Sequence, residues 1–166
     1  MPTALPSLVV VTGRPGSGKS TLVHPLARAL RLPLISRDEI KEGMATAPDQ
    51  NANAAFFNAI RLLLDHGVGL VAEAAFQHRL WAPNLEPLRA VAEIRAIVLT
   101  VDAALAQARH ENRAELDAER GRFHDVGPLN PTYEPPRLGL PTLGVDTTDG
   151  YRPSFEEIVL FAQSRS

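Results

Sequence analysis

The stretch Gly-Arg-Pro-Gly-Ser-Gly-Lys-Ser-Thr at residues 13–21 constrains the fold of this 166-residue chain more than any other feature. The apolar run SLVVVT at 7–12 precedes it, and the following segment, STLVHPLARALRL, is rich in helix-forming residues. Together they predict a buried strand, a tight glycine-rich turn and a helix in direct succession. We expect Pro25 to kink this helix or delay its start, because proline deletes a backbone hydrogen bond.

The turn matches the pattern G-x-x-x-x-G-K-[ST], which forms a phosphate-binding loop (P-loop) when it lies between a strand and a helix. Its glycines let backbone N–H groups point at phosphate oxygens, and the helix N-terminus adds the positive end of its dipole. Lys19 is expected to reach the β- and γ-phosphates of a nucleoside triphosphate, and the Ser20 hydroxyl to bind Mg²⁺. The alternative is a glycine-rich turn that carries a lysine by chance. The predicted nucleotide-binding residues are Gly13, Arg14, Pro15, Gly16, Ser17, Gly18, Lys19, Ser20 and Thr21.

Short apolar segments alternate with helical patterns along the rest of the chain. Such alternation predicts βαβ units with right-handed crossovers, and therefore a three-layer α/β sandwich. We expect a single domain over residues 1–166, because this length suits one sizeable core. Strands are expected at 7–12, 32–36, 68–74, 94–101 and 141–146, and helical stripes at 56–64, 85–92, 103–116 and 155–162.

Composition narrows the class of protein further. The net charge of −2 provides no overall basic field for a nucleic-acid backbone, and a local basic groove is the remaining alternative. The longest apolar runs fall far below the roughly 18 residues of a membrane-spanning helix. The N-terminus, MPTALP, lacks the features of a signal peptide, and the chain has no cysteine. We therefore expect a cytoplasmic protein without a membrane partner, of unspecified oligomeric state.

Three segments resemble one known group of enzymes. GRPGSGKSTL, LISRDEIKEGM and LVAEAAFQHRL are similar to the small P-loop kinases, which include the kinase domain of phage-type polynucleotide kinase, chloramphenicol phosphotransferase, zeta-toxin-like kinases and gluconate kinase. The resemblance implies a five-stranded parallel sheet in the order 2-3-1-4-5, with an arginine-containing lid at about 109–127. It also implies MgATP as the phosphate donor and a hydroxyl group as the acceptor.

The pair Arg37-Asp38 follows the second expected strand. In polynucleotide kinases such a pair places an aspartate near the acceptor hydroxyl, so the resemblance implies Asp38 as general base and Arg37 in the substrate site. The alternative is a helix start, because Ser36 and Glu39 have the S-x-x-E spacing of a capping box. Lys41, also predicted in the substrate site, stands where polynucleotide kinases carry a phosphate-contacting arginine, and lysine lacks the bidentate contact of arginine.

Polar residues also follow the third expected strand. Glu73 lies at its end, where the resemblance implies an acidic residue that holds a Mg²⁺-bound water or the acceptor. The alternative is a glutamate that reaches solvent. Gln77, His78 and Arg79 are predicted in the substrate site, because ligands of open α/β sheets bind at the carboxyl ends of strands. A solvated helix start is the alternative for His78 and Arg79.

Arginines gather in the segment ARHENRAELDAERGRFHD. On a continuous helix Arg109, Arg113 and Arg120 project within about 40° of one another, and Arg122 follows. This spacing resembles the lid of the same kinases, whose arginines neutralise charge on the transferring phosphate. Arg113 and Arg120 are the predicted catalytic arginines. Ordinary surface pairing, such as Arg113 with Asp117, is the alternative.

Two loops complete the predicted site. The segment 125–141 holds five prolines and two glycines, and is either a lid or binding loop or an irregular surface crossing. Thr147 and Thr148, in VDTTDG, are expected to contact the nucleotide base, although the same residues favour a turn. The sequence thus predicts an ATP-dependent kinase that acts on a small-molecule hydroxyl. A kinase of polynucleotide 5′-hydroxyls, and an ATP-binding module without an acceptor, are the alternatives.

Overall fold

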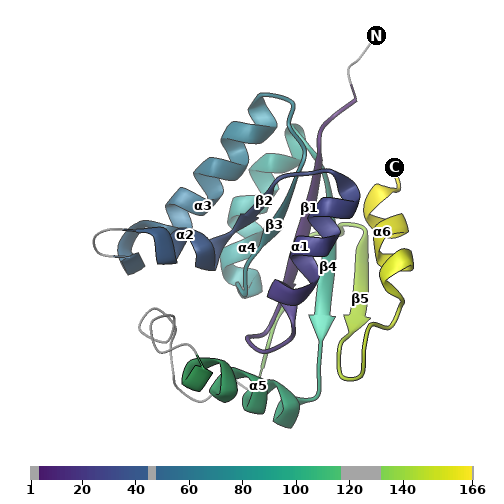
Figure 1. Cartoon of the computed structure of the whole chain (residues 1–166). Helices are drawn as coiled ribbons and strands as arrows, with labels where there is room; N and C mark the ends of the chain where they lie inside the picture. Colours follow the sequence, from purple (N-terminus) through teal and green to yellow (C-terminus); the bar gives the residue numbers. More distant parts are fainter. Residues whose placement is uncertain (1–3, 45–47, 117–131, 166) are drawn as a thin grey trace.

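A computed structural model describes residues 4–44, 48–116 and 132–165 of the chain. One sheet of five parallel strands forms the centre of the molecule, in the order β2-β3-β1-β4-β5 (Figure 1). This order and the helices on both faces confirm the predicted fold class. The strands are β1 (Ser7–Gly13), β2 (Leu34–Ser36), β3 (Leu70–Glu73), β4 (Glu93–Thr100) and β5 (Thr142–Asp146).

The register of the strands determines where the site lies. Ser36 of β2 pairs with Glu73 of β3, which in turn pairs with Val11 of β1. Because all three strands are parallel, their carboxyl ends meet at the same edge of the sheet. The loop that follows β1 therefore emerges beside the residues that follow β2 and β3.

Two helical layers cover the sheet. Helices α1 (Lys19–Leu30) and α6 (Phe155–Gln163) pack on one face, and α3 (Pro48–Asp65), α4 (His78–Leu85) and the 3₁₀ helix η1 (Glu86–Ala90) pack on the other (Figure 1). Helix α2 (Arg37–Gly43) follows β2 directly, and α5 (Ala103–Leu116) begins shortly after β4. Both therefore start at the edge where the strands end.

Alternation along β1 divides the apolar side chains between two cores. Leu8 and Val10 pack with Phe56 and Trp81 on the face covered by α3 and α4, and Val9 contributes to the core under α1 and α6. All five side chains are fully buried. Burial of each such side chain stabilises the fold by about 1.5–3 kcal/mol, which explains why the P-loop follows an uninterrupted apolar run.

The helices differ from the expectations in two places. Helix α1 begins at Lys19 and continues through Pro25, so the expected late start is wrong. Pro25 has no N–H to donate to the carbonyl of Thr21. Both residues are exposed, so water can hydrogen-bond to that carbonyl. The stripe at 85–92 is not one helix, because α4 ends at Leu85 and η1 follows with Pro87 in its first turn. No helix in the described ranges is long and apolar enough to cross a membrane.

Candidate functional site

The loop between β1 and α1 has the backbone geometry that the P-loop motif predicts. Gly16 and Gly18 have φ angles of 80° and 89°, a region that favours glycine. Gly18 is the N-cap of α1 and offers no side-chain cap, so the first N–H groups of the helix remain available to a ligand. The Lys19 ammonium donates a hydrogen bond of 2.9 Å to the carbonyl of Arg14, which folds the lysine back over the loop.

Gly16 lies against the backbone of α5. A Cβ atom at this position would come within 2.3 Å of the Ala106 carbonyl oxygen, which is far inside van der Waals contact. The loop and α5 are therefore in direct contact, and a side chain on Gly16 would force them apart.

We expect Gly16→Ala to lower the free energy of unfolding by at least about 2 kcal/mol, since it combines backbone strain with a backbone clash. Gly150→Ala is the matched control, because Gly150 has a φ of 75° with no atom within 4 Å of its would-be Cβ. The control should introduce only the backbone strain, and its free energy of unfolding should fall by about 1 kcal/mol. Urea unfolding curves of both variants measure the difference, and equal losses would show that the contact with Ala106 is unimportant.

The loop after β5 contacts the P-loop through Thr147. Thr147 is buried, and its hydroxyl lies 2.7 Å from the carbonyl oxygen of Ser17. The Arg109 guanidinium donates a 3.2 Å hydrogen bond to the Thr147 carbonyl and thereby connects α5 to this loop. Thr148 is exposed. The Thr147 hydroxyl thus has a structural role, and the contact of Thr147 and Thr148 with a nucleotide base stays a prediction.

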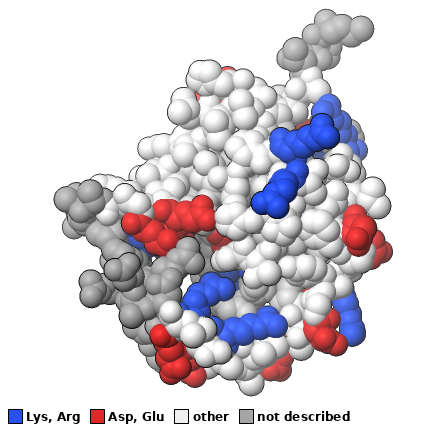
Figure 2. Space-filling view, in the orientation of Figure 1, with Lys and Arg blue, Asp and Glu red and all other residues white. Residues whose placement is uncertain are grey.

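A cavity of about 250 Å³ opens where β2 and β3 end. Figure 2 shows the hollow with acidic side chains on the side of α2, and with both basic and acidic side chains on the side of α5. Five predicted site residues, from four separate segments of the chain, thus meet around one space. The polar lining comes from Ser20, Thr21 and His24 of α1, Asp38, Glu39 and Glu42 of α2, Ser36 and Glu73 at the strand ends, and Arg113 of α5.

Glu73 is the buried carboxylate of the cavity. Its side chain is 3% exposed, so the alternative that it reaches solvent is wrong. The Ser36 hydroxyl donates a 2.7 Å hydrogen bond to Oε2 of Glu73. Burial raises the pKa of Glu73, while the positive charge of Lys19 and the bond from Ser36 oppose that shift. Burial likewise lowers the pKa of Lys19, the charges of Glu73 and Asp38 oppose this, and the charge of Arg113 adds to it.

The raised pKa of Glu73 predicts a pH-dependent stability. Above the ordinary value of 4.5, the folded state retains this proton more strongly than the unfolded chain. The free energy of unfolding therefore falls as the pH rises from 4.5 through the raised pKa. We expect Glu73→Gln to remove this decline, because glutamine does not titrate.

Urea unfolding of wild type and Glu73→Gln at pH 4.5, 5.5 and 6.5 measures this effect. Glu86→Gln is the control, because Glu86 lies on η1 and pairs with Arg89 at the surface. The difference in the free energy of unfolding between wild type and Glu73→Gln should change with pH. The corresponding difference between wild type and Glu86→Gln should stay small. A constant difference for Glu73→Gln would contradict the prediction.

Ser36 joins the cavity to the start of α2. Ser36 is the N-cap residue of α2. Its hydroxyl accepts a 3.5 Å hydrogen bond from the backbone N–H of Glu39 and donates one to Glu73. An oxygen of the Glu39 carboxylate lies 3.1 Å from Nε2 of His24 on α1. Ser36 thus caps α2 as the spacing predicts, and the Glu39 carboxylate links α2 to α1.

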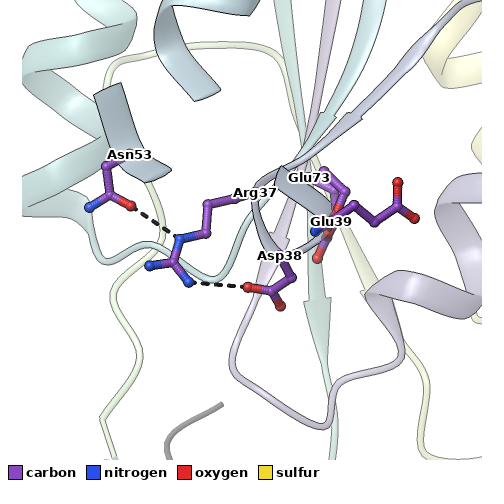
Figure 3. Close-up of polar contacts among 6 residues, drawn as sticks. Arg37, Asp38, Glu39, Asn53 and Glu73 are labelled. Carbon is purple, nitrogen blue, oxygen red and sulfur yellow. Dashed lines mark hydrogen bonds and ion pairs between the residues drawn. The ribbon is translucent and has the colours of Figure 1, made fainter. Parts of the chain in front are cut away.

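Asp38 lies in the first turn of α2 and faces the cavity. The Arg37 guanidinium bonds both to Oδ1 of Asp38, at 3.2 Å, and to Oδ1 of Asn53 on α3, at 3.1 Å (Figure 3). Arg37 is therefore held by α3 and fixes the orientation of the Asp38 carboxylate. Capping by Ser36 and a chemical role for Asp38 are compatible, because different side chains carry them.

Other predicted residues lie elsewhere. Gln77 accepts a 2.7 Å hydrogen bond from the backbone N–H of Glu134, and Nδ1 of His78 accepts one of 3.1 Å from that of Arg137. Both side chains thus fasten the proline-rich segment to the start of α4, and Arg79 is exposed. Neither these three nor the buried Lys41 line the described cavity, and their substrate contacts remain predictions.

Parts of the predicted lid fall outside the described residues. Arg120 and Arg122 belong to the segment 117–131, so their roles stay predictions. Sequence reasoning missed Tyr133, whose hydroxyl bonds to Thr12 at the end of β1. Trp81, which follows the third strand at the same edge of the sheet, donates a 2.9 Å hydrogen bond to the same threonine. No sequence pattern signals this contact, because it joins positions 12, 81 and 133.

Comparison with known proteins shows a family and a set of structural relatives. A family model described as an AAA domain matches residues 8–130. The solved structure of a candidate kinase from Chloroflexus aurantiacus has a TM-score of 0.82 and 26% identity, over 96% of this chain and 97% of that chain. No curated protein sequence matches significantly.

Two further solved structures share the fold at lower identity. APS kinase from Mycobacterium tuberculosis, in complex with AMPPNP and APS, has a TM-score of 0.69 and 17% identity, over 98% of this chain and all of that chain. A gluconokinase from Sinorhizobium meliloti has a TM-score of 0.59 and 20% identity, over 96% and 91%. The P-loop and the cavity beside it therefore lie in a kinase fold.

Proposed function

Because the chain belongs to the AAA domain family and has the fold of the small P-loop kinases, we propose that it transfers the γ-phosphate of ATP to a hydroxyl group of a small molecule. One observation carries the proposal. Ser20, Asp38, Glu73 and Arg113 come from four segments of the chain and line a single cavity beside the P-loop lysine. A phosphate-binding side chain, a carboxylate base and a cation are the groups that phosphoryl transfer requires.

The P-loop binds the donor. The backbone N–H groups of residues 16–20 and the Lys19 ammonium hold the β- and γ-phosphates. Lys19 donates to the Arg14 carbonyl at 2.9 Å, and a charged phosphate oxygen is a stronger acceptor than this neutral carbonyl. Arg113, on the α5 side of the cavity, neutralises charge on the phosphoryl group as it moves.

Asp38 acts on the acceptor. Its carboxylate accepts the proton of the acceptor hydroxyl as the new O–P bond forms and the bond between the γ-phosphorus and the β,γ-bridging oxygen breaks. The products are ADP and a phosphate ester, and the proton passes from Asp38 to solvent. Arg37 and Asn53 hold the carboxylate in position for this step.

The residues around the cavity fit a magnesium ion. Mg²⁺ is usually bound by one or two carboxylates together with substrate phosphates, rather than by a cage of protein ligands. No group of three metal-binding side chains occurs in the described ranges, whereas the Ser20 hydroxyl and the Glu73 carboxylate share the cavity. We propose these two residues as the protein's contribution. When bound, the ion neutralises charge on the phosphates.

A phosphate-transfer screen tests the proposal. ATP labelled in the γ-phosphate is offered with nucleosides, sugars, antibiotics and 5′-hydroxyl oligonucleotides, and products are separated from inorganic phosphate. We expect label in a small-molecule product. Label only in oligonucleotides, with binding that weakens steeply as salt increases, would indicate a polynucleotide kinase. Label only in inorganic phosphate would indicate a hydrolysing module without an acceptor.

A further inference from the structure

We propose that Ser36 is a positioning residue, which holds the Glu73 carboxylate in place for the complex of metal ion and nucleotide. The inference rests on the proposed function and adds to it a residue that acts through Glu73. Ser36 is the last residue of β2 and pairs in register with Glu73 at the end of β3. The two residues line the cavity and are 6% and 3% exposed.

The proton of the Ser36 hydroxyl is directed at Glu73. A hydroxyl carries one proton and two acceptor lone pairs, and the backbone N–H of Glu39 can only donate. Ser36 therefore accepts from Glu39, at 3.5 Å, and its own proton serves Oε2 of Glu73, at 2.7 Å. The bond to Glu73 has the usual length for two oxygens, whereas the bond from Glu39 is longer than usual for an N–H donor. The hydroxyl therefore stabilises the position of the carboxylate more than it stabilises the helix cap.

The backbone around Ser36 makes this donor rigid. Ser36 ends a strand of the sheet and is the N-cap of α2, with φ −105° and ψ 127°. A glutamate side chain, in contrast, has several rotatable bonds, and fixing it costs conformational entropy. Figure 3 shows Glu73 beside the turn that carries Asp38 and Glu39. A donor fixed by the backbone can hold the Glu73 carboxylate in one orientation, as outer hydrogen bonds do for metal ligands in other proteins.

Binding of Mn²⁺, a paramagnetic substitute for Mg²⁺, tests the inference without any acceptor. Electron paramagnetic resonance measures free Mn²⁺ while the protein is in excess over the ATP analogue AMPPNP. We expect Ser36→Ala to raise the Kd of Mn²⁺ about tenfold or more, the usual loss when an outer hydrogen bond to a metal ligand is removed. Ser36→Thr should stay within about threefold of the wild type, because threonine keeps the hydroxyl and is also a favourable N-cap residue.

A double-mutant cycle separates positioning from a general effect on the fold. If Ser36 acts through Glu73, Ser36→Ala should cost less than about twofold in Mn²⁺ affinity when Glu73→Gln is already present. Ser154→Ala is the matched control, because Ser154 is the N-cap of α6 and its hydroxyl accepts from the backbone N–H of Glu157 at 3.3 Å. This variant also loses a helix cap, but Ser154 does not line the cavity, so the Kd of Mn²⁺ should not change. Thermal unfolding curves verify that each variant is folded.

The inference is wrong if Ser36→Ala or Glu73→Gln binds Mn²⁺ like the wild type. It is also wrong if Ser36→Thr or Ser154→Ala loses as much affinity as Ser36→Ala, or if the loss from Ser36→Ala persists in full in the Glu73→Gln background. The binding assay involves no phosphate transfer, so these results leave the kinase proposal standing. That proposal fails instead if the wild type releases the γ-phosphate only to water with every acceptor in the screen.

Discussion

Asp38→Asn is expected to bind ATP with an affinity within about twofold of the wild type and to transfer phosphate roughly 10²–10⁴ times more slowly. Asparagine has nearly the same shape as aspartate and cannot accept the proton of the acceptor hydroxyl. The Asp38 side chain is 41% exposed, so its replacement does not disturb a buried core. The donor phosphates are held by the P-loop, which does not include Asp38.

Asp65→Asn provides the matched control for this experiment. Asp65 is also helical and accepts from an arginine, Arg61, at 2.7 Å, but it lies at the end of α3 and does not line the cavity. Isothermal titration calorimetry with ATP measures donor binding, and single-turnover kinetics measure phosphate transfer. Wild-type transfer by Asp38→Asn would show that Asp38 is not the base.

Lys19→Met is expected to weaken ATP binding and to lower transfer at least 10²–10³-fold, the usual loss when one donor to a developing charge is removed. The ammonium of Lys19 is the P-loop group that the proposal assigns to the β- and γ-phosphates. Methionine fills a similar volume. Burial lowers the pKa of Lys19, which means that the buried positive charge itself costs free energy. The fold should therefore tolerate the change, which a thermal unfolding curve verifies.

Lys41→Met is the comparison for this variant. Lys41 is nearly as buried as Lys19, at 8% against 7% exposed, and does not line the cavity. It should retain the ATP affinity of the wild type. Normal ATP binding and transfer by Lys19→Met would contradict the assignment of the P-loop motif. Equal losses of ATP affinity in both variants would indicate a general effect of removing a buried lysine.

The sequence predicts the fold and the donor side of the site because the signals there are local. An apolar run, a glycine pattern and a helical segment adjoin one another at 7–32, and steric rules make this strand-turn-helix unit nearly independent of the rest. The positions of Asp38 and Glu73 follow from the same logic. Each stands at the end of a predicted strand, and parallel strands bring their carboxyl ends to one edge.

The acceptor side depends on contacts between distant segments, which the sequence does not specify. Asn53 holds Arg37 from another helix, and Ser36 bonds to Glu73 across two strands. Gln77 and His78 follow a strand as predicted, yet their polar atoms bond to the backbone of the proline-rich segment. Spacing along the chain cannot distinguish a side chain that faces a substrate from one that fastens a loop.

The fate of the γ-phosphate tests the central claim most directly. Phosphorus NMR follows the reaction of the wild-type protein with ATP, Mg²⁺ and the acceptors that the transfer screen identifies. If the screen identifies none, all of its acceptors are used. The proposed function predicts that ADP forms together with an equal amount of a phosphate monoester, and that this signal is lost in Asp38→Asn. Formation of ADP with inorganic phosphate alone, at the same rate in both proteins and with every acceptor, would contradict it.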